Sequence, residues 1–244
     1  MRKSGRAGNS GLRCGVTDLD GLGFLLADIE LSDDQCDYIA TSLPSVVDQR
    51  GGGRGLLSHP TVLQLIRHRQ LAQFLWALTG RELVAVAARL LDCGSTSETS
   101  TQWHQDRRVA VRERLDVQGY GPWTTRIGIS QVEPPSSVLD QMVVVQVHLD
   151  HSATENHVLR LFPGSHRGGK LTADAISHLV ETQAPVIRAI PKGSLVAMRP
   201  LLVHASSAAP TRLPHYRVLH IGFAPPEAIT PLQWHATVQL HRAA

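Results

Sequence analysis

The chain has 244 residues, of which 42% are hydrophobic and 18% are charged, and it carries a formal net charge of +3 with a pI near 9.0. A chain of this length can bury enough surface to fold as a single domain. No stretch approaches the roughly 18 consecutive apolar residues of a membrane helix, and the basic residues are scattered instead of forming long runs interleaved with aromatics. We therefore expect a protein that binds neither a membrane nor nucleic acid.

The cysteines Cys14, Cys36 and Cys93 are widely spaced and form no C-x-x-C pair. They indicate neither a disulfide framework nor a thiolate zinc site. The basic N-terminus is not followed by an apolar run, which argues against a secretory signal. The sequence therefore predicts a cytoplasmic protein, and it leaves the oligomeric state open.

Residues 1–18 are rich in Gly, Ser, Arg and Lys, and we expect them to form a flexible arm ahead of a single domain over residues 19–244. Ser32 and Gln35 have the spacing of a capping box. They predict a helix that ends at Pro44, because proline cannot continue the backbone hydrogen bonding of a helix.

A second helix is predicted from about Pro60 to Leu78, with one apolar stripe and Gly80 after its end. The helical part of the domain would thus span about residues 32–80. From residue 83 onward the pattern changes to short strand-like runs separated by Gly, Pro and Ser turns, with one helix near Thr172 to Glu181. The predicted strands are Leu83–Leu91, Met142–Leu149, Pro185–Ile190, Ser194–Met198, Leu201–Ser206 and Tyr216–Phe223.

This element order predicts a mainly β fold with flanking helices and a double-stranded β-helix core, a cupin-like jelly roll, over about residues 83–225. A long excursion from residue 107 to 138 is too long for a simple turn, and we interpret it as a lid or substrate loop. Its arginines Arg108, Arg112 and Arg126 favour a small anionic or carboxylated substrate.

The segment from Thr101 to Asp106 places an imidazole and a carboxylate two residues apart. On a strand, side chains at i and i+2 leave the same face, so His104 and Asp106 can bind one metal ion. His204 alternates with Leu202 and Ser206 on a later strand and can complete a three-ligand face. Two histidines and one carboxylate leave three cis positions open on an octahedral ion, as in non-haem Fe(II) oxygenases.

Arg217 is in phase with Leu219 and Ile221 of the following strand, so it lies either on a polar outer face or in the interior with a dedicated anion. In an oxygenase, two open metal positions would take a bidentate 2-oxo acid and the third would take O2. The distal carboxylate of 2-oxoglutarate then needs a cation and a hydroxyl, which Arg217 and Ser206 could supply.

Several further motifs follow one another in a specific order. They are Trp103-His104-Gln105-Asp106, Val145 to Asp150, Glu155-Asn156, Phe162 to Lys170, His204-Ala205-Ser206 and Arg217. Through these motifs the chain resembles the phytanoyl-CoA dioxygenase family of Fe(II)/2-oxoglutarate-dependent oxygenases, and the likeness extends from about residue 20 to 225.

The resemblance implies a double-stranded β-helix that uses Fe(II), 2-oxoglutarate and O2. It implies that His104, Asp106 and His204 bind the catalytic iron, that Arg217 and Ser206 hold the 2-oxoglutarate C5 carboxylate, and that Thr101 faces the cosubstrate. Arg217 lies slightly farther from His204 than is common in the family. Arg212 is therefore an alternative anchor, although the strand phase favours Arg217.

Asp106 supplies the carboxylate that related halogenases replace with a small residue. We therefore expect hydroxylation of an unactivated C–H bond of a small molecule, with 2-oxoglutarate converted to succinate and CO2, and desaturation as another oxidative outcome. His148 and Asp150 form a second H-x-D motif, but Asp150 begins a turn, and we favour His104 and Asp106. The alternatives are a jelly-roll metal protein that is no oxygenase, or a metal-dependent isomerase or hydrolase, and a non-catalytic basic binding module.

Overall fold

The computed structural model describes residues 17–43, 53–92, 102–151, 158–206 and 216–241. The predicted arm over residues 1–18 lies outside this part of the chain except for residues 17 and 18, which belong to helix α1 (Thr17–Gly21). Within the described residues, no helix is long and apolar enough to cross a membrane.

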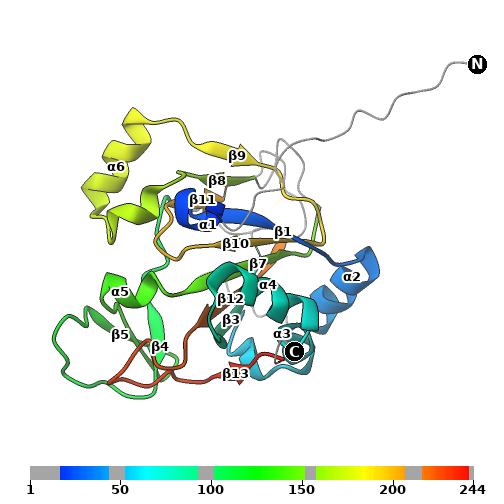
Figure 1. The fold of residues 1–244 in the computed structure, drawn as a ribbon, viewed down its shortest axis with the longest axis horizontal. Helices are drawn as coiled ribbons and strands as arrows, with labels where there is room; N and C mark the ends of the chain where they lie inside the picture. Colours follow the sequence, from blue (N-terminus) through cyan, green and yellow to red (C-terminus); the bar gives the residue numbers. More distant parts are fainter. Residues whose placement is uncertain (1–16, 44–52, 93–101, 152–157, 207–215, 242–244) are drawn as a thin grey trace, which may run out of the picture.

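A seven-stranded sheet forms the centre of the molecule, in the order β1-β10-β7-β12-β3-β13 with β2 also paired to β3 (Figure 1). All of its pairings are antiparallel. The strands are β1 (Phe24–Glu30), β2 (Gly53–Arg54), β3 (Val84–Asp92), β7 (Val143–His148), β10 (Ser194–Met198), β12 (Arg217–Ala224) and β13 (Val238–Gln239).

A smaller sheet in the order β11-β8-β9 packs against one face of the large sheet. Its strands are β11 (His204–Ser206), β8 (Leu159–Leu161) and β9 (Val186–Arg188). Leu159 and Leu161 lie in one buried cluster with Val144 and Val196 of the large sheet. The space between the two sheets is therefore the interior of the jelly roll, and the predicted fold class is confirmed.

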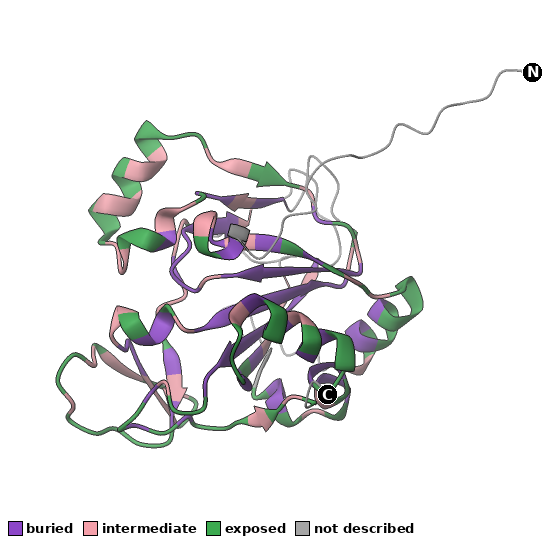
Figure 2. Cartoon of the chain, viewed as in Figure 1, coloured by how far each residue is buried: buried purple, intermediate pink, exposed green. Residues whose placement is uncertain are grey.

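Helices cover the other face of the large sheet. They are α2 (Asp33–Ser42), α3 (Pro60–Ile66) and α4 (Arg69–Thr79), and their buried residues join one cluster with Leu219, Ile221 and Phe223 of β12. Figure 2 shows the strands buried beneath helices whose outer sides are exposed. Side chains on β12 thus alternate between a face under the helices and a face inside the jelly roll.

The second predicted helix is in fact two helices, α3 and α4, separated at His68, which has an extended backbone with φ −67° and ψ 128°. Ile66 is buried, and a continuous helix would next direct Arg69 and Gln70 toward the core. The break shifts the helical phase so that Leu71 and Leu75 are buried instead. The prediction of one continuous helix was wrong because the apolar stripe slips at this point.

The excursion after residue 107 is not a plain loop. It forms a third antiparallel sheet of β4 (Val109–Val111), β6 (Ile129–Val132) and β5 (Trp123–Arg126), followed by α5 (Ser136–Leu139). The sequence also missed β1 and β8, whereas the helix near residue 172 is present as α6 (Ala173–Thr182), capped by the Thr172 side chain. An η2 turn (Ser165–Gly168) leads from β8 toward α6.

Candidate metal centre

His104, Asp106 and His204 converge between the two sheets, as their spacing predicts. Each offers one ligand atom, and these atoms all lie within 4.8 Å of one another. His104 and His204 exchange two backbone hydrogen bonds of 3.0 Å in an isolated β-bridge, and the Asp106 amide donates to the Pro200 carbonyl at 2.8 Å. A strand-like register, and not side-chain contacts alone, therefore brings these three candidate ligands together.

The tautomers of both histidines suit a metal. His104 Nδ1 lies 2.8 Å from the Gln102 carbonyl oxygen, and His204 Nδ1 lies 2.9 Å from the Leu202 carbonyl oxygen. A carbonyl oxygen only accepts, so each Nδ1 carries the proton and each Nε2 keeps its lone pair for coordination. Burial also lowers the pKa of His204 to about 3, which keeps its ring neutral.

Asp106 is held as an anion by its neighbours. Burial alone would raise its pKa, but the Arg89 guanidinium and the surrounding histidines outweigh burial and hold the pKa well below its ordinary value. Its Oδ1 accepts from Arg89 Nη2 at 2.9 Å, whereas the contact of its buried Oδ2 with His220 Nε2, at 3.3 Å, is an ion-pair contact, and no group of the described residues makes a well-formed hydrogen bond to this oxygen. A divalent cation bound by the two histidines would satisfy this oxygen, so the donor set fits Fe(II).

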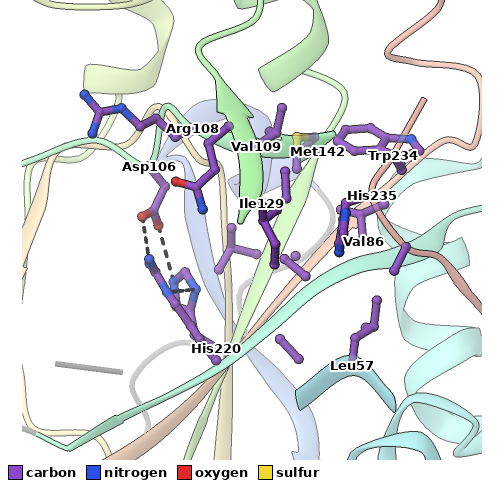
Figure 3. Close-up of a pocket in the computed structure, with 18 of the residues that line it drawn as sticks. Leu57, Val86, Asp106, Arg108, Val109, Ile129, Met142, His220, Trp234 and His235 are labelled. Carbon is purple, nitrogen blue, oxygen red and sulfur yellow. Dashed lines mark hydrogen bonds and ion pairs between the residues drawn. The ribbon is translucent and has the colours of Figure 1, made fainter. Parts of the chain in front are cut away.

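His220 lies beside this centre in a different role. Its Nδ1 accepts from Arg89 Nε at 3.2 Å, so its proton is on Nε2, which lies 3.3 Å from Asp106 Oδ2. Asp106 and His220 point toward each other in Figure 3. In this tautomer His220 presents a proton and no lone pair to the centre, so it orients the carboxylate instead of acting as a fourth ligand.

Gln105, which lies between His104 and Asp106 in the sequence, holds this segment in place through hydrogen bonds of its side chain. Its buried side-chain amide donates to the carbonyls of Gly169 at 2.8 Å and Leu201 at 2.7 Å. Its Oε1 accepts from the Leu171 amide at 2.9 Å. Both the amide nitrogen and the amide oxygen of this side chain are thereby paired, and the segment that carries His104 and Asp106 is tied to the segments around Leu201 and residues 169–171.

A cavity of about 680 Å³ opens on the Asp106 side of the centre. Figure 3 shows its walls, formed by the apolar side chains of Val86, Ile129, Met142 and Trp234 together with polar groups. The third sheet contributes one wall, because Ile129 and Gln131 come from β6. The excursion predicted as a substrate loop therefore lines the space next to the candidate centre.

The remaining predicted residues are not all brought to the centre. Ser206 lies on the same face of β11 as His204, two residues farther along. Arg217 lies on the helix-covered face of β12, where Asp150 pairs with it through Nη2 at 2.7 Å and Nε at 2.9 Å. Thr101 and Arg212 lie outside the described residues.

The second H-x-D motif does not form a metal pair. Asp150 is paired with Arg217, whereas His148 Nδ1 lies 2.9 Å from the Tyr216 hydroxyl inside the jelly roll. Arg89, His220 and Gln105 are functional candidates that the sequence analysis missed. The sequence did contain a signal for His220. It lies three residues after Arg217 on the same strand, so the two side chains must point to opposite faces of the sheet.

The fold and these residues together define a jelly-roll protein with a candidate metal centre of two histidines and one carboxylate. A family model described as phytanoyl-CoA dioxygenase (PhyH) matches residues 54–212. The chain belongs to this family of oxygenases, which depend on Fe(II) and 2-oxoglutarate and use O2. In a comparison with curated proteins, none matches the chain.

Solved structures share the fold. AviO1 from Streptomyces viridochromogenes Tue57 has a TM-score of 0.61 at 20% identity, over 89% of this chain and 96% of that chain. EctD from S. alaskensis, with 2-oxoglutarate and 5-hydroxyectoine, has a TM-score of 0.63 at 15% identity, over 87% of this chain and 76% of its own. The epimerase SnoN from nogalamycin biosynthesis, described as non-heme and alpha ketoglutarate dependent, has a TM-score of 0.59 at 14% identity, over 86% and 81%.

Proposed function

We propose that His104, Asp106 and His204 bind the catalytic Fe(II), and that the enzyme hydroxylates an unactivated C–H bond of a small molecule while 2-oxoglutarate is converted to succinate and CO2. The observation that carries this proposal is the convergence of the three ligand atoms within 4.8 Å of one another. Iron with 2-oxoglutarate would supply the oxidising chemistry, and the protein would position the substrate and exclude water.

The presence of Asp106 favours hydroxylation over halogenation. A halide can occupy a coordination position only where the protein leaves that position without a carboxylate, and here Arg89 and His220 hold a carboxylate in place. The fold itself does not decide the outcome, because SnoN is described as an epimerase. The argument for hydroxylation therefore rests on this chain's own ligand set.

We also propose that the substrate is anionic or carboxylated, because positive charge prevails in the cavity walls. The lining includes Arg89, Arg107, Arg108 and Arg126, against the carboxylates of Asp106 and Glu133. Glu133 is buried and lies 3.5 Å from both Arg107 Nε and Arg108 Nε, so part of this charge is compensated. The balance still favours a negatively charged group in the cavity.

Arginine variants test the substrate class. Arg108→Gln and Arg126→Gln should weaken binding of the substrate, whereas Arg112→Gln should not. Arg112 belongs to the same excursion, but it bonds the exposed Gln233 side chain and does not line the cavity. Equal affinity in all three variants, measured with substrates from a screen of small carboxylates, would refute the anionic class.

Anaerobic visible spectroscopy tests the iron site. We expect a weak charge-transfer band only when Fe(II) and 2-oxoglutarate are both added, and we expect His104→Ala to abolish it. His178→Ala is the matched control, because His178 is an exposed residue of α6. A wild-type protein with confirmed Fe(II) occupancy and no band would contradict the proposal.

Product analysis separates the oxidative outcomes. Once a substrate is found, hydroxylation adds one oxygen atom to the product, desaturation removes two hydrogen atoms, and epimerisation leaves the mass unchanged. Incorporation of label from 18O2 into the product, in proportion to succinate formed, is the expected result. A product of unchanged mass would refute hydroxylation and leave the oxygenase class intact.

A further inference from the structure

The interior of the jelly roll holds a polar pair that the ligand set does not use. His148 is 2% exposed, and its Nδ1 lies 2.9 Å from the Tyr216 hydroxyl. Its Nε2 is buried and has no hydrogen-bond partner among the residues that the structure describes. A buried polar nitrogen without a partner is unfavourable, and such an atom marks a place where a ligand can supply the missing bond.

Arg217, the family-type anchor for the distal carboxylate of 2-oxoglutarate, is already occupied. Its Nε and Nη2 both donate to the Asp150 carboxylate, and its Nη1 lies 3.3 Å from the Ala40 carbonyl oxygen of α2. These contacts place the guanidinium under the helices, on the face of β12 that packs with Leu219. Reaching the interior would require breaking a bidentate ion pair and passing through the sheet.

The opposite face of β12 carries Val218 and His220, and Tyr216 directly precedes this strand in the same phase. Val218 is paired with His148 of β7, and His220 contacts Asp106 of the metal centre. Two residues along a strand span about 7 Å. His148 is therefore separated from the metal centre, along the strand, by roughly the length of a five-carbon dicarboxylate.

We propose that the distal carboxylate of 2-oxoglutarate binds to His148 Nε2, with Tyr216 holding the imidazole, and that Arg217 is a structural residue. This inference rests on the proposed function, because the other end of the cosubstrate must chelate the iron. When the Tyr216 hydroxyl donates a hydrogen bond to Nδ1, the ring carries its own proton on Nε2. The Nε2–H group then donates a hydrogen bond to the carboxylate. The anchor is then a hydrogen bond from an imidazole in place of a guanidinium pair.

The test compares two 2-oxo acids of equal chain length. 2-Oxoglutarate has the distal carboxylate and 2-oxopentanoate ends in a methyl group, while both can chelate iron in the same way. Dissociation constants are measured anaerobically from the charge-transfer band of the Fe(II) protein. We expect wild type to prefer 2-oxoglutarate by about tenfold, corresponding to one hydrogen bond to a charged group.

Variants assign this preference to a residue. His148→Phe should abolish the preference while the band with 2-oxopentanoate persists, and His148→Gln, which keeps a donor, should restore part of it. Tyr216→Phe should reduce it, and Arg217→Lys should leave it unchanged. A preference that survives His148→Phe but is lost in the Arg217 or an Arg212→Gln variant would overturn the inference.

The two proposals fail differently. If wild type gives no band with either 2-oxo acid at full Fe(II) occupancy, the proposed function is refuted and the anchor falls with it. If both acids give a band but His148 variants do not alter their ratio, only the anchor is refuted. The band of 2-oxopentanoate also reports whether each variant keeps a folded metal site.

Discussion

Arg89 Nη2 donates to Asp106 Oδ1 over 2.9 Å, and Arg89 Nε donates to His220 Nδ1 over 3.2 Å. One guanidinium thus sets both the orientation of the carboxylate and the tautomer of the histidine beside it. This geometry presents Asp106 Oδ2 toward His104 and His204, the two candidate ligand histidines, with His204 Nε2 at 3.9 Å. Partners of this kind contribute to metal affinity without touching the metal.

Arg89→Gln should therefore weaken Fe(II) binding by about ten- to hundredfold, because the carboxylate loses its fixed orientation. Arg89→Lys keeps the charge but cannot donate to both partners in one plane, and we expect an intermediate loss. Anaerobic titration with a competing chelator gives the affinities, with Arg81→Gln as control because Arg81 is an exposed residue that bonds the Gln141 side chain. Tighter binding in Arg89→Gln would mean that charge repulsion outweighs orientation.

The pair of Arg217 and Asp150 should stabilise the fold independently of the metal. Both side chains are about one-fifth exposed and make two parallel hydrogen bonds. A double-mutant cycle with Arg217→Met and Asp150→Asn, measured by urea unfolding, should give a coupling free energy of about 1–3 kcal/mol.

The control for this cycle is Lys192 and Asp37, a pair in which Asp37 is largely exposed. Solvent screens such a pair, so its coupling should be smaller. A coupling at Arg217 and Asp150 no larger than that of the control would show that the bidentate geometry contributes little.

The elements that local pattern determines were predictable from the sequence. Alternating strands, the Ser32 capping box and the i, i+2 spacing of His104 and Asp106 depend only on neighbouring residues. The phase of β12 was equally readable, and it placed Arg217 and His220 on opposite faces. What that phase could not decide was which face lies inside the jelly roll.

The remaining features depend on register between distant strands. His220 is paired with Arg89 because β12 pairs with β3, and Val218 is paired with His148 because β12 also pairs with β7. Asp150 reaches Arg217 through the same register. No spacing within the sequence specifies these pairings, so the partner of Arg217 and the polar pair of His148 and Tyr216 emerged only from the fold.

Replacing Gln105 with glutamate, which has nearly the same shape, should destabilise the protein. In Gln105→Glu, a carboxylate would face the carbonyl oxygens of Gly169 and Leu201, which the amide now satisfies. The buried Leu201 carbonyl and the partly buried Gly169 carbonyl would lose their donor, and we expect a loss of about 2–4 kcal/mol in the free energy of unfolding. Thermal and urea unfolding measure it, with Gln183→Glu at the exposed end of α6 as control. Equal stability of the two variants would contradict this prediction.

Finally, His148 should make the protein sensitive to acid. Burial lowers its pKa to about 3 from an ordinary value of 6.5, so between these values the unfolded chain binds a proton that the folded protein does not. The free energy of unfolding therefore rises with pH through this range. His148 should contribute a slope of up to about 1.4 kcal/mol per pH unit, so its contribution to stability decreases as the pH falls below 6.5. Urea unfolding of metal-free protein from pH 7 to pH 4 should give a shallower slope for His148→Gln than for wild type or the exposed-site variant His178→Gln. Identical slopes in all three proteins would mean that His148 is protonated in the folded state, or that its burial is relieved before unfolding.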